Sequence, residues 1–244
     1  MSRAFGSWHV TQGDIRTFLA LSESWGQAAY QAEWAKAEKE FAAHFDPDRD
    51  DVDGHVDAFN EAVGGLWPSD FSWMLRAAAL KDAVTAFEVY LEKALDEVFS
   101  AHLAVDDEGR RLRLQVTRPK RSGAPDYKVL VRLHRLLGNE VDTEAVRHIR
   151  ELRHLLTHQR GELRTEEQRL RFSDERHEGE LSLTPYVGGE VPLRDERVQE
   201  LLDDLGAVVR GADPAVWRYS AWGGEGLPEM TGSILKLLEC TPVD

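Results

Sequence analysis

Hydrophobic positions between residues 69 and 103 recur every three or four residues, which is the spacing of one face of an α-helix. The recurring residues are Leu80, Val84, Phe87, Leu91, Leu95 and Val98. Pro68 precedes Ser69 and Asp70, and either of these short polar residues can serve as the N-cap of the helix. A helix of about 30 residues is about 45 Å long, which is typical of a helical bundle.

Other segments show weaker periodic patterns, and most of these are helical. The sequence predicts further helices over residues 13–45, 55–63, 127–137, 144–162 and 195–210. An approximate helical stripe in the first of them consists of Phe18, Trp25, Ala28, Ala32 and Ala35. Alternation of polar and apolar residues predicts a short strand over 111–117, and residues 180–193 resemble a hairpin. The pattern therefore predicts an all-α bundle with a short β-hairpin insertion and an N-terminal helical extension.

The helix predicted over residues 144–162 has two chemically different sides. At about 100° per residue, its apolar side comprises Val146, Ile149, Leu152 and Leu156, with Leu155 at the edge. The opposite side comprises Arg147, Arg150, Glu151, His154 and His158. Arg153 lies at the border, where its stem can follow apolar surface while its guanidinium reaches outward. Thr143 is expected to cap the start of this helix and Gly161 to end it.

The charge of the chain is unevenly distributed. The formal net charge is −14, which argues against a protein whose whole surface is basic and made for polyanions. Residues 108–176, however, contain 17 Lys and Arg against 11 Asp and Glu, so the segment around the 144–162 helix is positive. A locally basic site on an acidic body is compatible with RNA binding.

The remaining composition limits the class of protein. No run approaches the roughly 20 apolar residues that a membrane span requires, and the first residues lack the apolar core of a secretory signal. The single cysteine, Cys240, excludes an intrachain disulfide and a cysteine-rich metal site. The sequence therefore predicts a cytoplasmic protein that does not have a membrane as a partner.

The residues alone leave three interpretations of Arg153, His154 and His158 open. The two histidines are four residues apart and could share a metal ion, although HLLTH lacks the glutamate of the HExxH zinc-protease pattern. They could also belong to a solvated polar face. The third interpretation is metal-free phosphoryl transfer on RNA, in which histidine moves protons and arginine binds the phosphate. Arg153 and His158 lie about 140° apart around one helix, so their convergence would require a second copy across a two-fold axis or fraying of the helix end.

The stretch LRHLLTHQRG resembles the signature of the HEPN superfamily, in which Arg is followed by a polar residue, three further residues and His. Here Arg153, His154 and His158 occupy the signature positions. The Gln-Arg-Gly at 159–161 is similar to the polar-polar-Gly that follows the His in several HEPN branches. The order of elements also resembles the family, with a long helix first, the motif helix late and an amphipathic helix last. The resemblance covers about residues 69–210.

This resemblance implies a metal-independent endoribonuclease that needs no cofactor, often a toxin or an antiviral defence effector. It implies a homodimer in which the two motif helices are apposed. Carried over by position, Arg153 is expected to hold the scissile phosphate, His158 to transfer the proton of the 2′-hydroxyl, and His154 to support them. The expected RNA-binding residues are Arg147, Arg150 and Arg160.

The same resemblance suggests how the chain is divided. Residues 1–68 are expected to be an N-terminal helical extension, 69–211 a HEPN-like helical domain, and 212–244 a C-terminal tail that packs on the body. The expected partners are RNA, a second copy of the chain, and an antitoxin or regulatory protein. Some HEPN domains are not nucleases, so the alternative is a non-catalytic dimerisation or nucleotide-sensing module.

Overall fold

The computed structural model describes residues 1–244 except for 52, 106–107, 120–122, 173–187 and 243–244. In the described residues the protein is mainly helical, as predicted, with eight helices and one small antiparallel sheet. The helices are α1 (Arg3–His44), α2 (Gly54–Ala62), α3 (Pro68–Phe99), α4 (Tyr127–Leu136), α5 (Glu144–His158), α6 (Glu166–Arg171), α7 (Asp195–Tyr219) and α8 (Gly232–Leu235). The strands are β1 (Leu103–Val105), β2 (Arg111–Val116) and β3 (Leu238–Pro242).

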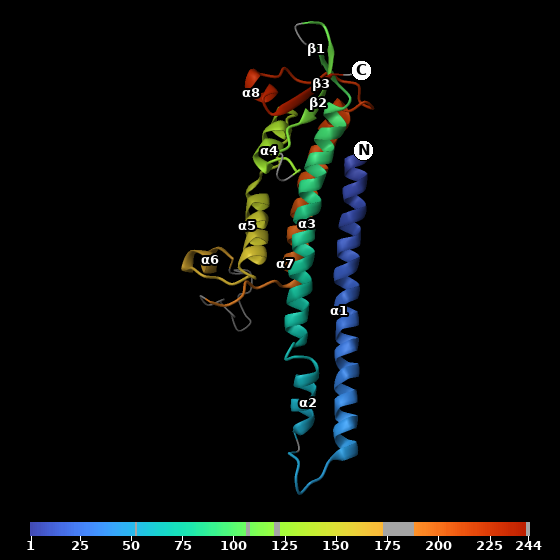
Figure 1. The fold of residues 1–244 in the computed structure, drawn as a ribbon, viewed down its shortest axis with the longest axis vertical. Coiled ribbons are helices and arrows are strands. Elements are labelled where there is room, and N and C mark those ends of the chain that lie inside the picture. The colour runs from blue at the N-terminus through green and yellow to red at the C-terminus, as the bar shows by residue number, and fades with distance from the viewer. Residues whose placement is uncertain (52, 106–107, 120–122, 173–187, 243–244) are drawn as a thin grey trace.

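The helix α3 lies at the centre of the bundle, with α1 on one side and α4 and α5 on the other (Figure 1). It begins at Pro68, because the first turn of a helix does not need the N–H that proline lacks. The N-cap is Trp67, so the expectation that Ser69 or Asp70 caps this helix is wrong. The Asp70 carboxylate instead accepts a hydrogen bond from the backbone N–H of Trp67 at 3.0 Å. All six periodic residues of α3 are buried, as predicted.

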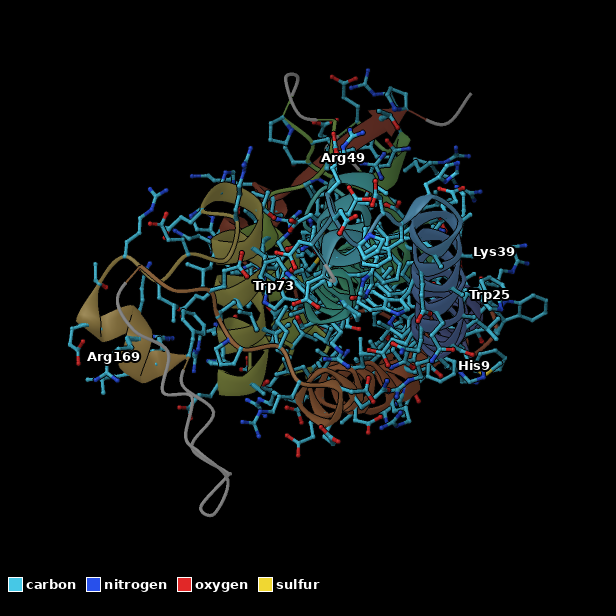
Figure 2. All side chains as sticks on the ribbon, turned by 90° about the horizontal axis from the view of Figure 1, so that it is seen from below. His9, Trp25, Lys39, Arg49, Trp73 and Arg169 are labelled. Carbon is cyan, nitrogen blue, oxygen red and sulfur yellow. The ribbon has the colours of Figure 1, made fainter. Side chains whose placement is uncertain are left out.

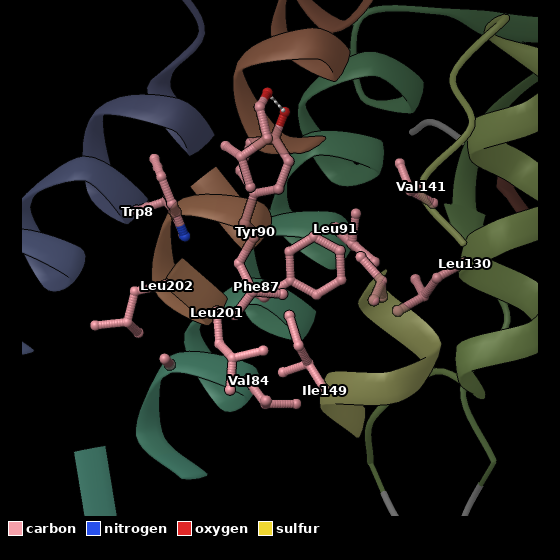
Figure 3. Close-up of a cluster of buried hydrophobic side chains, with 14 of the residues drawn as sticks. Trp8, Val84, Phe87, Tyr90, Leu91, Leu130, Val141, Ile149, Leu201 and Leu202 are labelled. Atoms are coloured by element: carbon pink, nitrogen blue, oxygen red, sulfur yellow. Dashed lines mark hydrogen bonds between the residues drawn. The ribbon is translucent and has the colours of Figure 1, made fainter. Parts of the chain in front are cut away.

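The main hydrophobic core surrounds the middle of α3. Phe87 and Tyr90 of α3 lie among side chains from the neighbouring helices, including Trp8 of α1 and Ile149 of α5 (Figure 3). The Tyr90 hydroxyl donates a hydrogen bond to the Val209 carbonyl of α7 at 3.4 Å. The core therefore joins α1, α3, α5 and α7 into one packed unit.

The helix α1 contributes to this core only through its first half. Its buried residues are Ala4, Trp8, Ile15 and Leu19, which all belong to the main core cluster. The predicted extension at residues 1–68 thus shares a core with the rest of the bundle. The stripe of Phe18, Trp25, Ala28, Ala32 and Ala35 lies on the other side of the helix and is exposed.

The second half of α1 pairs with α2 through aromatic side chains. The Phe59 ring lies 4.9 Å from the Tyr30 ring and 5.0 Å from the Trp34 ring, measured between centroids. Phe59 is only 1% exposed, yet it is not part of the main core cluster. This end of the molecule therefore has a small aromatic core of its own.

The sheet has the order β1-β2-β3, and both pairings are antiparallel. The predicted strand over 111–117 is present as β2, and its hairpin partner is β1. The hairpin expected over 180–193 falls mostly outside the described residues, and residues 190–193 are not a strand: Glu190 makes an isolated bridge with Glu162. β3, which the sequence did not predict, ties the end of the chain to β2 by placing Leu238 opposite Val116.

The helix α7 is longer than predicted, because it continues past Arg210 and through Pro214 to Tyr219. Proline inside a helix removes the hydrogen bond to the carbonyl four residues earlier, here that of Arg210, which is an exposed residue that water can reach. Ala212 and Val216 are buried, so core packing favours continuing the helix. The predicted domain boundary at residue 211 therefore falls inside α7.

Carboxylates of neighbouring helices hold the start of α1. Glu97 of α3 accepts hydrogen bonds from the backbone N–H groups of Arg3 and Ala4 at 3.2 and 3.0 Å. Asp213 of α7 accepts one from Ser2 at 3.0 Å. Negative charge at a helix N-terminus is favourable because the first backbone N–H groups lack partners within the helix.

We expect Glu97→Gln to lower the free energy of unfolding by about 1 kcal/mol, because the amide keeps one acceptor oxygen but loses the charge. Glu61→Gln, at an exposed position on α2, is the matched control and is expected to change stability by less than about 0.5 kcal/mol. Urea unfolding of both variants measures the difference. Equal losses for both would contradict a role of Glu97 in holding α1.

Candidate functional site

Most of the predicted site residues lie on helix α5, which is anchored by its buried apolar side and by its N-cap. Its apolar side, comprising Val146, Ile149, Leu152, Leu155 and Leu156, is buried as predicted. Thr143 is the N-cap, and its side chain accepts a hydrogen bond from the backbone N–H of Val146 at 3.2 Å. The amphipathic pattern therefore determines which side of α5 remains available for chemistry.

The end of α5 is held by a close contact with α3. The helix ends at His158, four residues earlier than predicted, and the chain turns through Arg160 and Gly161 with φ angles of 52° and 81°. The indole N–H of Trp73 donates a hydrogen bond to the Val191 carbonyl at 2.8 Å, and Val191 N–H donates to the Gly161 carbonyl at 2.8 Å. Trp73 thus lies against Gly161 and links α3 to the turn that ends α5.

A cleft of about 670 Å³ lies between α5, α3 and α6. Its charged side chains are Arg147, Arg150, Arg153, Arg171, Glu88, Glu151 and Glu167, with His154 beside them. Four arginines against three glutamates make a mixed cleft, in which an anion binds most readily at an arginine that has no carboxylate partner.

Arg150 is occupied by contacts within the chain. Its Nε donates a hydrogen bond to Glu88 at 3.0 Å, and its guanidinium lies 3.3 Å from the centre of the Tyr127 ring. The Tyr127 hydroxyl in turn donates to Asp142 at 3.1 Å. Burial and the negative charge of Asp142 raise the pKa of Tyr127, so its hydroxyl stays protonated. Arg150 therefore joins α5 to α3 and α4 as well as lining the cleft.

Two other cleft arginines also face carboxylates. Arg147 lies 3.8 Å from an Asp142 oxygen and is exposed. Arg171 of α6 forms an ion pair with Glu151 of α5, which closes the outer side of the cleft. These exposed pairs are weak and can exchange for a phosphate.

Arg153 is the cleft arginine whose guanidinium has no hydrogen bond or ion pair within the part of the chain that the structure describes. It is partly buried, while His154 and His158 are exposed. The His154 and His158 rings lie 4.5 Å apart between centroids, as expected for residues one helical turn apart. Arg153 and His154 therefore offer an unpaired cation and an imidazole on one wall of the cleft.

Of the six predicted site residues, the structure gathers four, Arg147, Arg150, Arg153 and His154, in the cleft. His158 and Arg160 lie outside its lining, at the end of α5. Arg153 and His158 are therefore not brought to one cleft within a single chain. Their five-residue spacing places them about 140° apart around the helix, and His158 is the last residue of α5, beyond the residues that line the cleft.

The opposite wall of the cleft was missed from the sequence. Thr165, Glu167, Gln168 and Arg171 come from α6 and its start, a segment that the sequence left without an assigned element. The pattern Thr-Glu-Glu-Gln at 165–168 is a capping signal, and the Thr165 hydroxyl accepts a hydrogen bond from the backbone N–H of Gln168 at 3.1 Å. That pattern could have identified the helix.

His148, which was not predicted as a site residue, lies beneath this wall. Its ring is 5.3 Å from the Phe172 ring, and it is partly buried. Burial, with smaller contributions from Arg197 and Arg171, lowers the pKa of His148. It therefore stays neutral near pH 7 and adds no positive charge to the site.

The described residues contain no group of three His, Cys, Asp or Glu side chains that could hold a metal ion. None of their helices combines the length and apolar character needed to cross a membrane. In comparisons with known proteins, no family, no curated protein and no solved structure matches this chain.

Proposed function

We propose that this protein is a metal-independent endoribonuclease of the HEPN type, acting in a toxin or antiviral defence setting. The observation that carries the proposal is the position of Arg153, an arginine without a carboxylate partner among the described residues, beside His154 in the α5 cleft. The motif resemblance supplies the reaction, and the cleft supplies a place where a phosphate can meet arginine and histidine.

The reaction needs only groups that α5 carries. The 2′-oxygen of RNA attacks the adjacent phosphorus while a neutral histidine removes its proton. The bond between phosphorus and the 5′-oxygen breaks, and that oxygen receives a proton, which leaves a 2′,3′-cyclic phosphate. Arg153 binds the phosphate and stabilises the negative charge that develops on its oxygens.

The proposed active unit is a dimer. His158 is exposed at the end of α5 and lies outside the cleft of its own chain. A two-fold axis near the end of α5 would bring His158 of one copy towards Arg153 of the other, because a two-fold contact presents the same surface twice. The site would then be complete only in the assembly.

The runner-up is a non-catalytic HEPN-like dimerisation or nucleotide-sensing module. Its support is the pairing of Arg150 with Glu88 and Tyr127, which gives one predicted RNA-binding residue a structural role. An arginine held in this way has fewer free N–H groups with which to bind RNA. The cleft would then recognise a smaller phosphate ligand instead.

Cleavage of a labelled single-stranded RNA in the presence of EDTA tests the proposal. We expect cutting to give 2′,3′-cyclic phosphate ends and to stop when the 2′-hydroxyl at the cut site is replaced by hydrogen. Arg153→Ala and His158→Ala are each expected to lower the rate by about a hundredfold, because each removes a group that acts in the transition state.

Arg132→Ala and His44→Ala are the matched controls, since both residues are exposed and lie outside the cleft. We expect them to change the rate by less than about twofold. Circular dichroism establishes that all four variants are folded. Cleavage that persists in both Arg153→Ala and His158→Ala rules out this site, and the absence of cleavage in the native protein, with nucleotide binding retained, favours the runner-up.

A further inference from the structure

The helix α1 carries an exposed row of residues at alternating spacings of four and three, which we call the outer stripe. It consists of Asp14, Phe18, Leu21, Trp25, Ala28, Ala32, Ala35 and Lys39, and all eight are exposed. Figure 2 shows Trp25 and Lys39 on the side of α1 that faces away from the bundle. This spacing is the heptad pattern of helices that pair along their length.

The outer stripe is more apolar than the solvent-exposed face of a helix usually is. Phe18, Leu21 and Trp25 are 45%, 43% and 65% exposed. Residues 17–32 contain a single charged residue, Glu23, which forms an ion pair with Arg76 of α3 on the other side of the helix. A continuous apolar surface of this kind marks a contact with another protein.

The stripe lies apart from the core packing of α1, although Asp14 and Phe18 at its start also line a groove between α1 and α3. Leu19 belongs to the main core, and Tyr30 and Trp34 contact Phe59 of α2. The α5–α6 cleft lies on the opposite side of the bundle, as the positions of Trp25 and Arg169 indicate (Figure 2). A partner on the outer stripe would therefore leave the cleft open.

The order of side-chain sizes along the stripe identifies a second copy as the partner. The large residues Phe18, Leu21 and Trp25 come first, and the three alanines follow. A two-fold axis passing between residues 26 and 27 makes two copies antiparallel. It then pairs Phe18 with Ala35, Leu21 with Ala32 and Trp25 with Ala28, and each pair occurs twice. Each large side chain meets a small one, so the helices can approach closely.

The charged ends of the stripe agree with the same register. The two-fold axis that pairs Trp25 with Ala28 also places Asp14 opposite Lys39 of the second copy. Neither residue has an ion pair within the described part of its own chain. A parallel arrangement would instead place Asp14 on Asp14 and Trp25 on Trp25, which is unfavourable for both charge and packing.

We propose that the chain forms an antiparallel homodimer through the outer stripe of α1, with Trp25 and Ala28 at its centre and Asp14–Lys39 ion pairs at both ends. The contact extends over about 37 Å of helix. The proposal does not depend on nuclease activity, because it involves no residue of the α5 cleft.

Sedimentation velocity of the full chain over a range of concentrations tests the proposal. We expect the native protein to sediment with at least twice the mass of one chain, because the α5 contact proposed above would add a second interface. Trp25→Glu and Ala28→Glu each place a charge at the centre and are expected to raise the dissociation constant by at least about a hundredfold. Met74→Glu, at an exposed apolar residue of α3, is the matched control and should leave the mass unchanged.

A charge exchange tests the register. Asp14→Lys alone is expected to raise the dissociation constant by about tenfold, and the double variant Asp14→Lys with Lys39→Asp to restore it. A native protein that stays monomeric up to about 100 μM overturns the proposal. A sedimenting mass that neither Trp25→Glu nor Ala28→Glu lowers also overturns it, because every interface must then lie elsewhere. Failure of the double variant to restore the dimer overturns the antiparallel register.

Discussion

Gly161→Ala is expected to lower the free energy of unfolding by about 3 kcal/mol, through two separate effects. Gly161 has a φ of 81°, a left-handed conformation that costs an L-residue about 1 kcal/mol. A Cβ at this position would also lie 2.6 Å from Cζ2 and 2.9 Å from Cη2 of Trp73. The indole cannot move away freely, because its N–H is bonded to the Val191 carbonyl. Urea unfolding of the variant measures the loss.

Gly138→Ala is the matched control for this prediction. Gly138 has a φ of 82°, but a Cβ there would have no neighbour within 4 Å. It should therefore show only the conformational cost of about 1 kcal/mol. The difference between the two variants measures the contact between Gly161 and Trp73. Equal losses would mean that Trp73 moves aside, and that this contact does not hold the end of α5.

Acidification from pH 7 to pH 4 is expected to cost the protein about 3 kcal/mol of stability through His134 alone. His134 is fully buried in α4, and burial lowers its pKa to about 4. Its Nε2 lies 3.0 Å from the Leu91 carbonyl, an acceptor, so Nε2 carries the proton. Nδ1 is buried and has no hydrogen-bond partner among the described residues, so a second proton there would find no acceptor among them.

The direction of the change in stability with pH follows from the pKa of His134 in the folded and in the unfolded chain. The unfolded chain takes up a proton near pH 6.5 and the folded chain only near pH 4, so stability is complete above pH 6.5 and falls as the pH drops towards 4. His134→Gln cannot titrate and serves as the control. Subtracting its pH dependence removes the contributions of the carboxylates and of His148, whose pKa burial also lowers. Parallel stability curves for the two proteins would contradict the prediction.

The elements that the sequence predicts well are those whose signals are local. The helix α5 follows from its own apolar pattern, from Thr143 as its cap and from the glycine that ends it. The four residues that meet in the cleft from this helix were predictable for the same reason, because one helix face places them together. His158 shares this face with His154, but it is the last residue of α5 and lies beyond the cleft lining.

The features that the sequence did not predict depend on contacts between distant segments. Nothing local in residues 238–242 identifies β3, which exists because β2 offers it an open edge. The end of α7 was placed too early because Gly211 and Pro214 normally stop a helix, whereas burial of Val216 favours continuing it. Periodicity showed that α1 is a helix but not which row of residues would be covered, so the exposure of Trp25 became visible only in the fold.

The separate aromatic core between α1 and α2 gives the molecule two levels of local stability. Phe59 and its neighbours can part without disturbing the main core. We call the second half of α1 with α2 the arm, and expect it to open at a lower free energy than the bundle unfolds. The proposed pairing through the outer stripe requires the second half of α1 to be helical, so it disfavours any opening in which that half unfolds. By mass action, such opening becomes rarer as the protein concentration rises.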